Sequence, residues 1–137
     1  MSKAKILLVD DDPDLVEAMR MVLEAAGFDC VHALSGTRAL ELLPREKPDL
    51  MVLDVMMDDM TEGFHVAYKI RKPEPGLENF RDIPIIMLTA IGQRTGMKFD
   101  RNADGDYLPV DEFLEKPVQP SVLVEKVRAL LEKRARS

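Results

Sequence analysis

Short apolar runs divide this chain at regular intervals. They lie at residues 5–9, 50–53 and 83–88, and strand-like segments that include more polar residues lie at 29–34 and 112–115. Long runs without polar alternation are typical of strands that are buried on both faces of a parallel sheet. The pattern therefore predicts five strands that share one hydrophobic core.

The segments between these runs carry the spacing and the boundary residues of helices. Asp12, which a proline follows, is a predicted N-cap, and Gly27 predicts the end of that first helix. Ser35 predicts the cap of a second helix, which we expect Pro44 and Pro48 to close. Helical segments therefore separate the first three strands.

Two further helices continue the alternation. We expect one over residues 64–72 and the last from Pro120 onward, whereas glycines interrupt residues 91–111. Strands that alternate with helices predict an α/β fold with a doubly wound, five-stranded parallel sheet and right-handed crossovers. We expect residues 1–137 to form a single domain without an attached output domain.

Composition narrows the classes of function. The chain has 137 residues, of which 46% are hydrophobic, and a formal net charge of −6, which disfavours direct contact with nucleic acid because phosphates repel such a surface. The single cysteine, Cys30, excludes an internal disulfide, and we expect it to be partly buried in a strand. We find neither a signal peptide nor an apolar run of about 20 residues, so we expect a cytoplasmic protein without membrane contact.

Polar residues follow the predicted strands. Asp10 and Asp11 follow the first strand, Asp54 the third, Thr89 the fourth and Lys116 the fifth. The carboxyl ends of parallel strands lie at one edge of a sheet, where such folds bind ligands. Each residue alone also suits a turn, a cap or a surface position, but their convergence indicates a site.

The chemistry of this set points to phosphoryl transfer. Close carboxylates repel one another unless a hard cation lies among them, and Mg²⁺ suits a site with few carboxylates that also recruits phosphate oxygens. Lys116 and Thr89 supply an ammonium and a hydroxyl for phosphoryl oxygens, and Asp54 would be the nucleophile that forms an acyl phosphate. The chain has no glycine-rich phosphate loop, so we do not expect a bound nucleotide to be the donor.

The site residues stand in four short motifs: Val9-Asp10-Asp11, Val52-Leu53-Asp54, Leu88-Thr89-Ala90 and Phe113-x-x-Lys116-Pro117. In this order the motifs resemble the signature of response-regulator receiver domains of two-component systems, over nearly the whole chain. The resemblance implies a flavodoxin-like sheet with strand order 2-1-3-4-5. It also implies that a sensor histidine kinase or a histidine phosphotransfer protein phosphorylates Asp54.

The resemblance further implies a set of metal ligands. Asp11, Asp54 and the backbone carbonyl of Met56 would bind Mg²⁺ directly, and Asp10 would bind it through a water molecule. The family usually has a proline where this chain has Asp58, which adds negative charge beside the site. This departure suits either a solvated loop or an altered kinase interaction and phosphoryl lifetime.

The same resemblance assigns the residues that respond to the phosphoryl group. Thr89 and Lys116 would bind its oxygens, and Phe113 would be the aromatic switch residue whose ring turns inward when Thr89 moves. The peptide bond between Lys116 and Pro117 is expected to be cis. These residues would couple phosphorylation to a partner-binding face.

Residues 91–111 depart most from the family. The stretch is longer than usual, and the expected fourth helix has no clear apolar stripe, which indicates a specialised partner or a short, displaced or disordered helix. The sequence Asp100-x-Asn102-x-Asp104-Gly105, with Asp111 at the twelfth position, resembles the start of a calcium-binding loop. The flanking segments do not suit such a loop, so a polar turn is favoured.

We therefore predict a signalling switch rather than an enzyme, which accepts a phosphoryl group on Asp54 and acts on an output partner that the sequence does not identify. The alternative is a protein-binding module with the same fold that works without phosphorylation. A hydrolase that uses an aspartyl phosphate is disfavoured because nothing in the chain suggests a cap or a substrate pocket.

Overall fold

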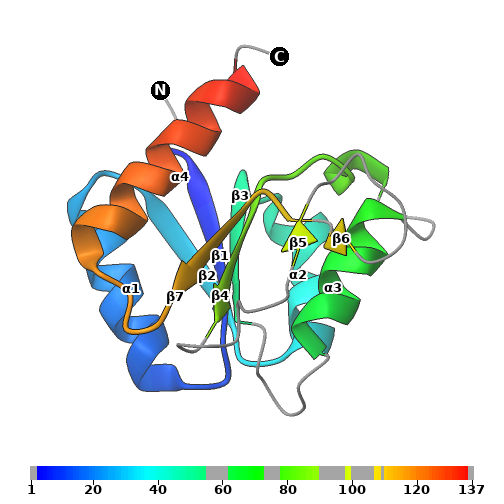
Figure 1. Cartoon of the computed structure of the whole chain (residues 1–137), viewed down its shortest axis with the longest axis horizontal. Coiled ribbons are helices and arrows are strands. Elements are labelled where there is room, and N and C mark those ends of the chain that lie inside the picture. Colours follow the sequence, from blue (N-terminus) through cyan, green and yellow to red (C-terminus); the bar gives the residue numbers. More distant parts are fainter. Residues whose placement is uncertain are drawn as a thin grey trace.

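The central sheet has five parallel strands (Figure 1). The computed structural model describes residues 3–54, 62–72, 78–89, 98–99, 107–108 and 110–135. The strands are β1 (Lys5–Val9), β2 (Asp29–Ala33), β3 (Leu50–Asp54), β4 (Ile85–Thr89) and β7 (Glu112–Glu115). Their order in the sheet is β2-β1-β3-β4-β7, and all four pairings are parallel. The predicted order 2-1-3-4-5 is confirmed.

Helices cover both faces of this sheet. The helices α1 (Pro13–Ala25) and α4 (Pro120–Ala135) lie on one face, and α2 (Gly36–Glu46) and α3 (Glu62–Arg71) lie on the other (Figure 1). A short 3-10 helix, η1 (Glu78–Phe80), precedes β4. In the part of the chain that the structure describes, no helix is both long and apolar enough to cross a membrane.

Successive residues of each central strand pack into opposite halves of the core. In β1, Leu7 and Val9 belong to the cluster under α2 and α3, whereas Ile6 and Leu8 belong to the cluster under α1 and α4. β3 and β4 alternate in the same way, and their apolar side chains are fully buried. Each buried aliphatic side chain stabilises the fold by about 1.5–3 kcal/mol. The central strands therefore hold the residues that follow them in fixed positions.

The predicted caps of the first two helices are confirmed, whereas the third helix begins at Glu62 rather than at residue 64. Asp12 caps α1, and its carboxylate accepts hydrogen bonds from the amides of Asp14 at 3.0 Å and Leu15 at 3.4 Å. Ser35 caps α2 by accepting from the amide of Arg38 at 3.2 Å. These caps satisfy amides that have no partner within a helix. They fix where each chain segment leaves the sheet edge.

The prediction that Pro44 closes α2 was wrong. The helix continues to Glu46, and Lys47 follows it in the left-handed conformation with φ 51°. A proline in a helix removes one amide donor. Leu42 and Leu43, which directly precede the proline, are buried, and their packing keeps the last turn helical.

The fourth predicted strand begins later than its apolar residues suggested. β4 starts at Ile85 rather than at Ile83, because Pro84 has no amide to donate to a neighbouring strand. The carbonyl of Pro84 still accepts a hydrogen bond from the amide of Met51 at 2.9 Å. The proline therefore marks the entry of the chain into the sheet.

The segment between β4 and β7 is atypical, as expected. Within its described residues the only regular elements are β5 (Lys98–Phe99) and β6 (Tyr107–Leu108), which pair in parallel as a separate small sheet. The calcium-loop pattern at residues 100–105 lies outside the described residues. Asp111, the twelfth position of that pattern, binds an arginine side chain and a backbone amide instead. This contact disfavours a calcium site further.

Candidate functional site

The carboxyl ends of four strands bring the predicted site residues to one edge of the sheet. Asp10 follows β1, Asp54 and Thr89 end β3 and β4, and Lys116 follows β7. Asp10, Asp54 and Thr89 are almost completely buried, with exposed fractions of 0%, 2% and 0%. Buried polar groups at the rim of an apolar core are costly unless they are paired, so their pairing decides what the site can do.

Lys116 lies between two carboxylates. Its Nζ is 3.2 Å from Oδ1 of Asp54 and 3.4 Å from Oδ2 of Asp10. Burial lowers the pKa of Lys116, but the attraction of Asp10 and Asp54 together outweighs it, so the net pKa is raised above 10.5. The lysine therefore stays charged at physiological pH and holds a positive charge beside Asp54.

The position of Lys116 is fixed through its backbone. Its amide donates to the carbonyl of Thr89 at 2.7 Å, which extends the pairing of β7 with β4 past the last strand residue. The peptide bond from Lys116 to Pro117 is cis, as predicted. The lysine thus leaves the strand at a defined point next to Thr89.

Asp10 is the most constrained of the carboxylates. Its amide donates to the carbonyl of Ala33 at 3.2 Å, and its Oδ1 accepts from the amide of Asp12 at 3.0 Å. Its Oδ2 is buried without a hydrogen bond of good geometry, and Lys116 approaches it only at ion-pair distance. Burial, the largest cause, raises the pKa of Asp10, and Asp54 raises it further, while the Asp12 amide and Lys116 oppose this.

Three carboxylates are close enough to share one cation. Asp10, Asp11 and Asp54 each offer an oxygen, and these oxygens lie within 4.8 Å of one another. Asp11 is exposed, whereas the other two are buried. An oxygen-only set with surplus negative charge and an incompletely bonded Oδ2 suits a hard divalent cation. Met56, whose carbonyl was predicted to complete the ligand set, lies outside the described residues.

Thr89 and Phe113 are the two remaining predicted residues. Oγ1 of Thr89 is buried and has no hydrogen-bond partner among the described residues, so its hydroxyl can bind an additional group. Phe113 lies within β7, opposite Met87 of β4, and is buried in the cluster under α2 and α3. The predicted inward turn of its ring on phosphorylation stays a prediction.

Sequence reasoning missed one contribution to the site. The amide of Asp12 binds Oδ1 of Asp10, although only the capping role of the Asp12 side chain was predicted. Successive acidic residues at the start of a helix are a signal for such a turn, because an Asp side chain often binds the amide two residues on. The contact orients the Asp10 carboxylate.

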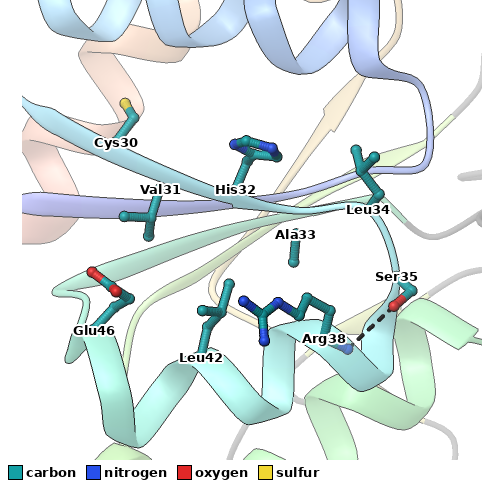
Figure 2. A pocket seen from close by; sticks show the side chains of 9 residues that line it. All are labelled: Cys30, Val31, His32, Ala33, Leu34, Ser35, Arg38, Leu42 and Glu46. Carbon is teal, nitrogen blue, oxygen red and sulfur yellow. Dashed lines mark hydrogen bonds between the residues drawn. The ribbon is translucent and has the colours of Figure 1, made fainter.

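A surface hollow lies away from these residues. It has a volume of about 590 Å³ and runs along the open edge of β2 and over α2 (Figure 2). Cys30, which is partly buried as predicted, contributes to it, and burial raises the pKa of its thiol to about 11. None of the predicted site residues lines this hollow, and volume alone does not identify the functional site.

Comparisons with known proteins agree with the fold and the motifs. A family model described as the response regulator receiver domain matches residues 6–128. The DNA-binding dual master transcriptional regulator RpaA of Synechocystis is 36% identical over 129 residues, which cover 93% of this chain and 48% of the relative. The phosphate regulon transcriptional regulatory protein PhoB of Pseudomonas aeruginosa is 35% identical over 92% of this chain and 51% of its own length. The chain therefore spans about half the length of these curated relatives.

Comparison with solved structures also indicates a receiver-domain fold. A CheY-like response regulator receiver domain protein from Methanospirillum hungatei superposes with a TM-score of 0.79 at 27% sequence identity, and the match covers 98% of both chains. Fold, motif order and family model agree over almost the entire sequence. The chain belongs to the response regulator receiver domain family of two-component signalling systems.

Proposed function

We propose that this chain is a phosphorylation switch, in which Asp54 accepts a phosphoryl group from a histidine kinase in a Mg²⁺-dependent reaction. The observation that carries the proposal is the charge imbalance around Asp54. Three carboxylates, those of Asp10, Asp11 and Asp54, approach within 4.8 Å, and one lysine ammonium faces two of them. A bound cation would offset the excess negative charge of these carboxylates and would stabilise the charge of a phosphoryl group beside them.

The donor set favours Mg²⁺. Within the described residues the donor set consists of a few carboxylates without histidine or cysteine, which is the kind of site that this ion prefers. Asp11 and Asp54 would ligate it directly, with the carbonyl of Met56, and Asp10 would act through water. When bound, the ion would neutralise the carboxylates and polarise the phosphoryl oxygens.

Asp54 would be the nucleophile. One carboxylate oxygen attacks phosphorus, a new O–P bond forms, the P–N bond of the donor phosphohistidine breaks, and its electron pair stays on the imidazole, which takes up a proton. Lys116, whose ammonium lies 3.2 Å from Asp54, would stabilise the charge on the phosphoryl oxygens. The unpartnered hydroxyl of Thr89 would donate a hydrogen bond to one of them.

The signal would leave through β4 and β7. Thr89 ends β4, and its carbonyl accepts a hydrogen bond from the amide of Lys116. A shift of Thr89 toward the phosphate would therefore displace the end of β7. Phe113 on β7 is buried in one core cluster together with Phe80, Ile83 and Val110. Movement of this ring would change the surface that an output partner recognises.

The donor is proposed to be a protein. A small apolar hollow of about 60 Å³ lies between α1 and the start of α4, close in sequence to Lys116. Its lining suits a single apolar side chain of a histidine kinase or a histidine phosphotransfer protein and comprises Leu15, Ala18, Met19, Val22, Val118, Pro120 and Leu123. DNA binding is stated in the name of the Synechocystis relative. The net charge of −6 on this chain favours protein partners instead.

The proposal is tested by intact-mass measurement. The protein is incubated with a small acyl phosphate and Mg²⁺, in parallel with Asp54→Ala and with Asp29→Asn, a control at the exposed start of β2. Wild type and Asp29→Asn should gain the mass of one phosphoryl group, and Asp54→Ala should gain none. Chelation of Mg²⁺ should abolish the gain.

Three results would contradict the proposal. A wild-type protein that stays unmodified would favour the phosphorylation-independent binding module. Continuous turnover of the donor or of external phosphomonoesters, without a stable modified protein, would favour a hydrolase. A gain of mass in Asp54→Ala equal to that of wild type would show that another residue accepts the phosphoryl group.

A further inference from the structure

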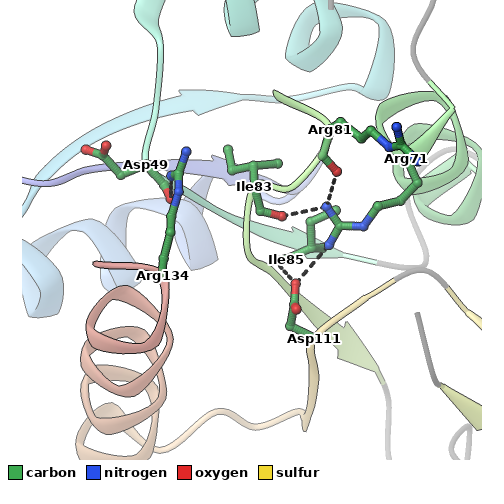
Figure 3. A network of polar contacts seen from close by, with 7 residues as sticks. All are labelled: Asp49, Arg71, Arg81, Ile83, Ile85, Asp111 and Arg134. Atoms are coloured by element: carbon green, nitrogen blue, oxygen red, sulfur yellow. Dashed lines mark hydrogen bonds and ion pairs between the residues drawn. The ribbon is translucent and has the colours of Figure 1, made fainter. Parts of the chain in front are cut away.

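A second buried ion pair lies at the edge of the sheet opposite to the acidic site (Figure 3). Arg71 ends α3, and Asp111 directly precedes β7. Nη2 of Arg71 is 2.8 Å from Oδ2 of Asp111, and the two side chains are only 11% and 9% exposed. The pair joins residues that are far apart in the sequence.

Both partners make further bonds. Nη1 of Arg71 donates to the carbonyls of Arg81 at 2.8 Å and Ile83 at 2.7 Å, in the segment that leads into β4. Oδ2 of Asp111 also accepts from the amide of Ile85 at 2.8 Å. A planar guanidinium suits such a junction because its donors point in fixed directions. Arg71 therefore ties α3, the start of β4 and the start of β7 together.

Asp111 and Ile85 bind each other twice. The Asp111 amide donates to the Ile85 carbonyl at 2.9 Å, while the Asp111 carboxylate accepts from the Ile85 amide. At the other end of the same strand pair, the Lys116 amide donates to the carbonyl of Thr89. The pairing of β7 on β4 is thus fixed at both ends.

β7 needs such a fixed start. It has four residues and pairs with β4 alone within the described sheet, and it follows the long segment that separates it from Thr89. A slip of two residues would keep Phe113 on its face of the sheet but move Lys116 by about 6–7 Å along the strand. Such a shift far exceeds the 3.2 Å between Lys116 and Asp54.

We propose that Arg71 and Asp111 are positioning residues for the phosphoryl-transfer site. They fix the start of β7 on β4 and thereby keep Lys116 within reach of Asp54 from the opposite edge of the sheet. This inference rests on the proposed function of Asp54. It does not require Arg71 or Asp111 to touch the reacting atoms.

The test separates positioning from general stability. Arg71→Met and Arg71→Lys are compared with wild type and with Arg134→Met, a control at the same edge whose guanidinium donates to the Asp49 carbonyl (Figure 3). For each protein, folded by circular dichroism, the rate of phosphorylation by an acyl phosphate and the affinity for Mg²⁺ are measured. Hydrogen exchange of the Lys116 amide is followed in parallel.

Arg71→Met should slow phosphorylation by about tenfold to a hundredfold, the range expected for a misplaced group. Its Mg²⁺ affinity should stay within about twofold of wild type, because the carboxylate ligands sit on β1 and β3 and not on β7. Arg71→Lys keeps the positive charge but lacks the planar set of guanidinium donors, so its phosphorylation rate should lie between those of wild type and Arg71→Met. The Lys116 amide should exchange faster in both variants, and Arg134→Met should match wild type.

An unchanged rate in folded Arg71→Met would overturn the inference, and so would a parallel loss of rate and Mg²⁺ affinity. If Arg71→Met does not fold, Arg71→Lys decides by the same criteria. If wild type itself is not phosphorylated, the proposed function fails. In that case the exchange of the Lys116 amide still tests the pair, and unchanged protection in the variants would overturn it.

Discussion

Two buried groups of charges lie at opposite edges of the same sheet, and they are built in opposite ways. At one edge Arg71 and Asp111 form an ion pair at 2.8 Å. Backbone carbonyls accept further hydrogen bonds from Arg71, and a backbone amide donates one to Asp111. At the other edge Lys116 faces Asp10 and Asp54 across 3.4 and 3.2 Å. Among the described residues, the first group has one charge of each sign, and the second has three carboxylates and one ammonium.

The difference separates a structural group from a reactive one. Buried charges are tolerated when they are paired and fully hydrogen-bonded, and they are costly otherwise. The Arg71 pair meets this condition, whereas Oδ2 of Asp10 and Oγ1 of Thr89 lack good hydrogen bonds. A buried ion pair is therefore weak evidence of function, and an incompletely satisfied one is stronger evidence.

The largest expected effect is at the balanced pair. Arg71→Met leaves Asp111 buried without its cation, which should lower the free energy of unfolding by about 3–5 kcal/mol. Urea unfolding monitored by circular dichroism measures the change. A loss below about 1 kcal/mol would mean that the pair is not the structural group described here.

The opposite sign is expected at the acidic site. Asp10→Asn removes one of the repelling carboxylates, so without divalent cations it should raise the free energy of unfolding, by about 1–3 kcal/mol. Thermal unfolding with a chelator measures this gain. Added Mg²⁺ should stabilise wild type more than the variant. A variant less stable than wild type under chelation would contradict the charge imbalance.

The pH dependence sharpens the same comparison. Because the pKa of Asp10 is raised above 3.8, the folded protein binds this proton more tightly than the unfolded chain. Stability from this group is therefore lost as the pH rises from 3.8 through the folded pKa. The advantage of Asp10→Asn should be small at the lowest pH and grow toward neutrality, as urea unfolding of both proteins can show. An advantage that shrinks with rising pH would contradict this assignment.

The smallest effect is expected at an exposed pair. Arg38 and Glu41 approach at 3.4 Å on α2, with side chains 50% and 61% exposed. Glu41→Gln should change the free energy of unfolding by less than about 0.5 kcal/mol, because water and salt screen such pairs. The same urea measurement applies. A change comparable to that of Arg71→Met would remove the distinction between buried and exposed pairs.

Much of the fold and of the site edge was predictable from the sequence. Asp10, Asp54, Thr89 and Lys116 each stand at the end of a predicted strand, and a parallel sheet brings such strand ends together. The predicted caps rest on local rules that hold without knowledge of the tertiary structure. The assignment of Asp54 as the phosphoacceptor stays a prediction until it is measured.

The balanced pair was not predictable in the same way. Arg71 has the sequence position of an ordinary basic residue in a last helical turn, and Asp111 matched the end of a calcium-loop pattern. Their contact depends on where the long segment after β4 rejoins the sheet, which no local pattern specifies. The prediction that Pro44 ends the helix failed for a related reason, because the burial of neighbouring side chains outweighs the local tendency of proline to end a helix.

The most direct test of the account is the identity of the modified residue. After reaction with an acyl phosphate and Mg²⁺, borohydride reduction converts an aspartyl phosphate to homoserine, which peptide mass spectrometry can locate. The account predicts homoserine at position 54 and an unmodified Asp10 and Asp11. Modification at any other carboxylate, or none at position 54, would contradict it.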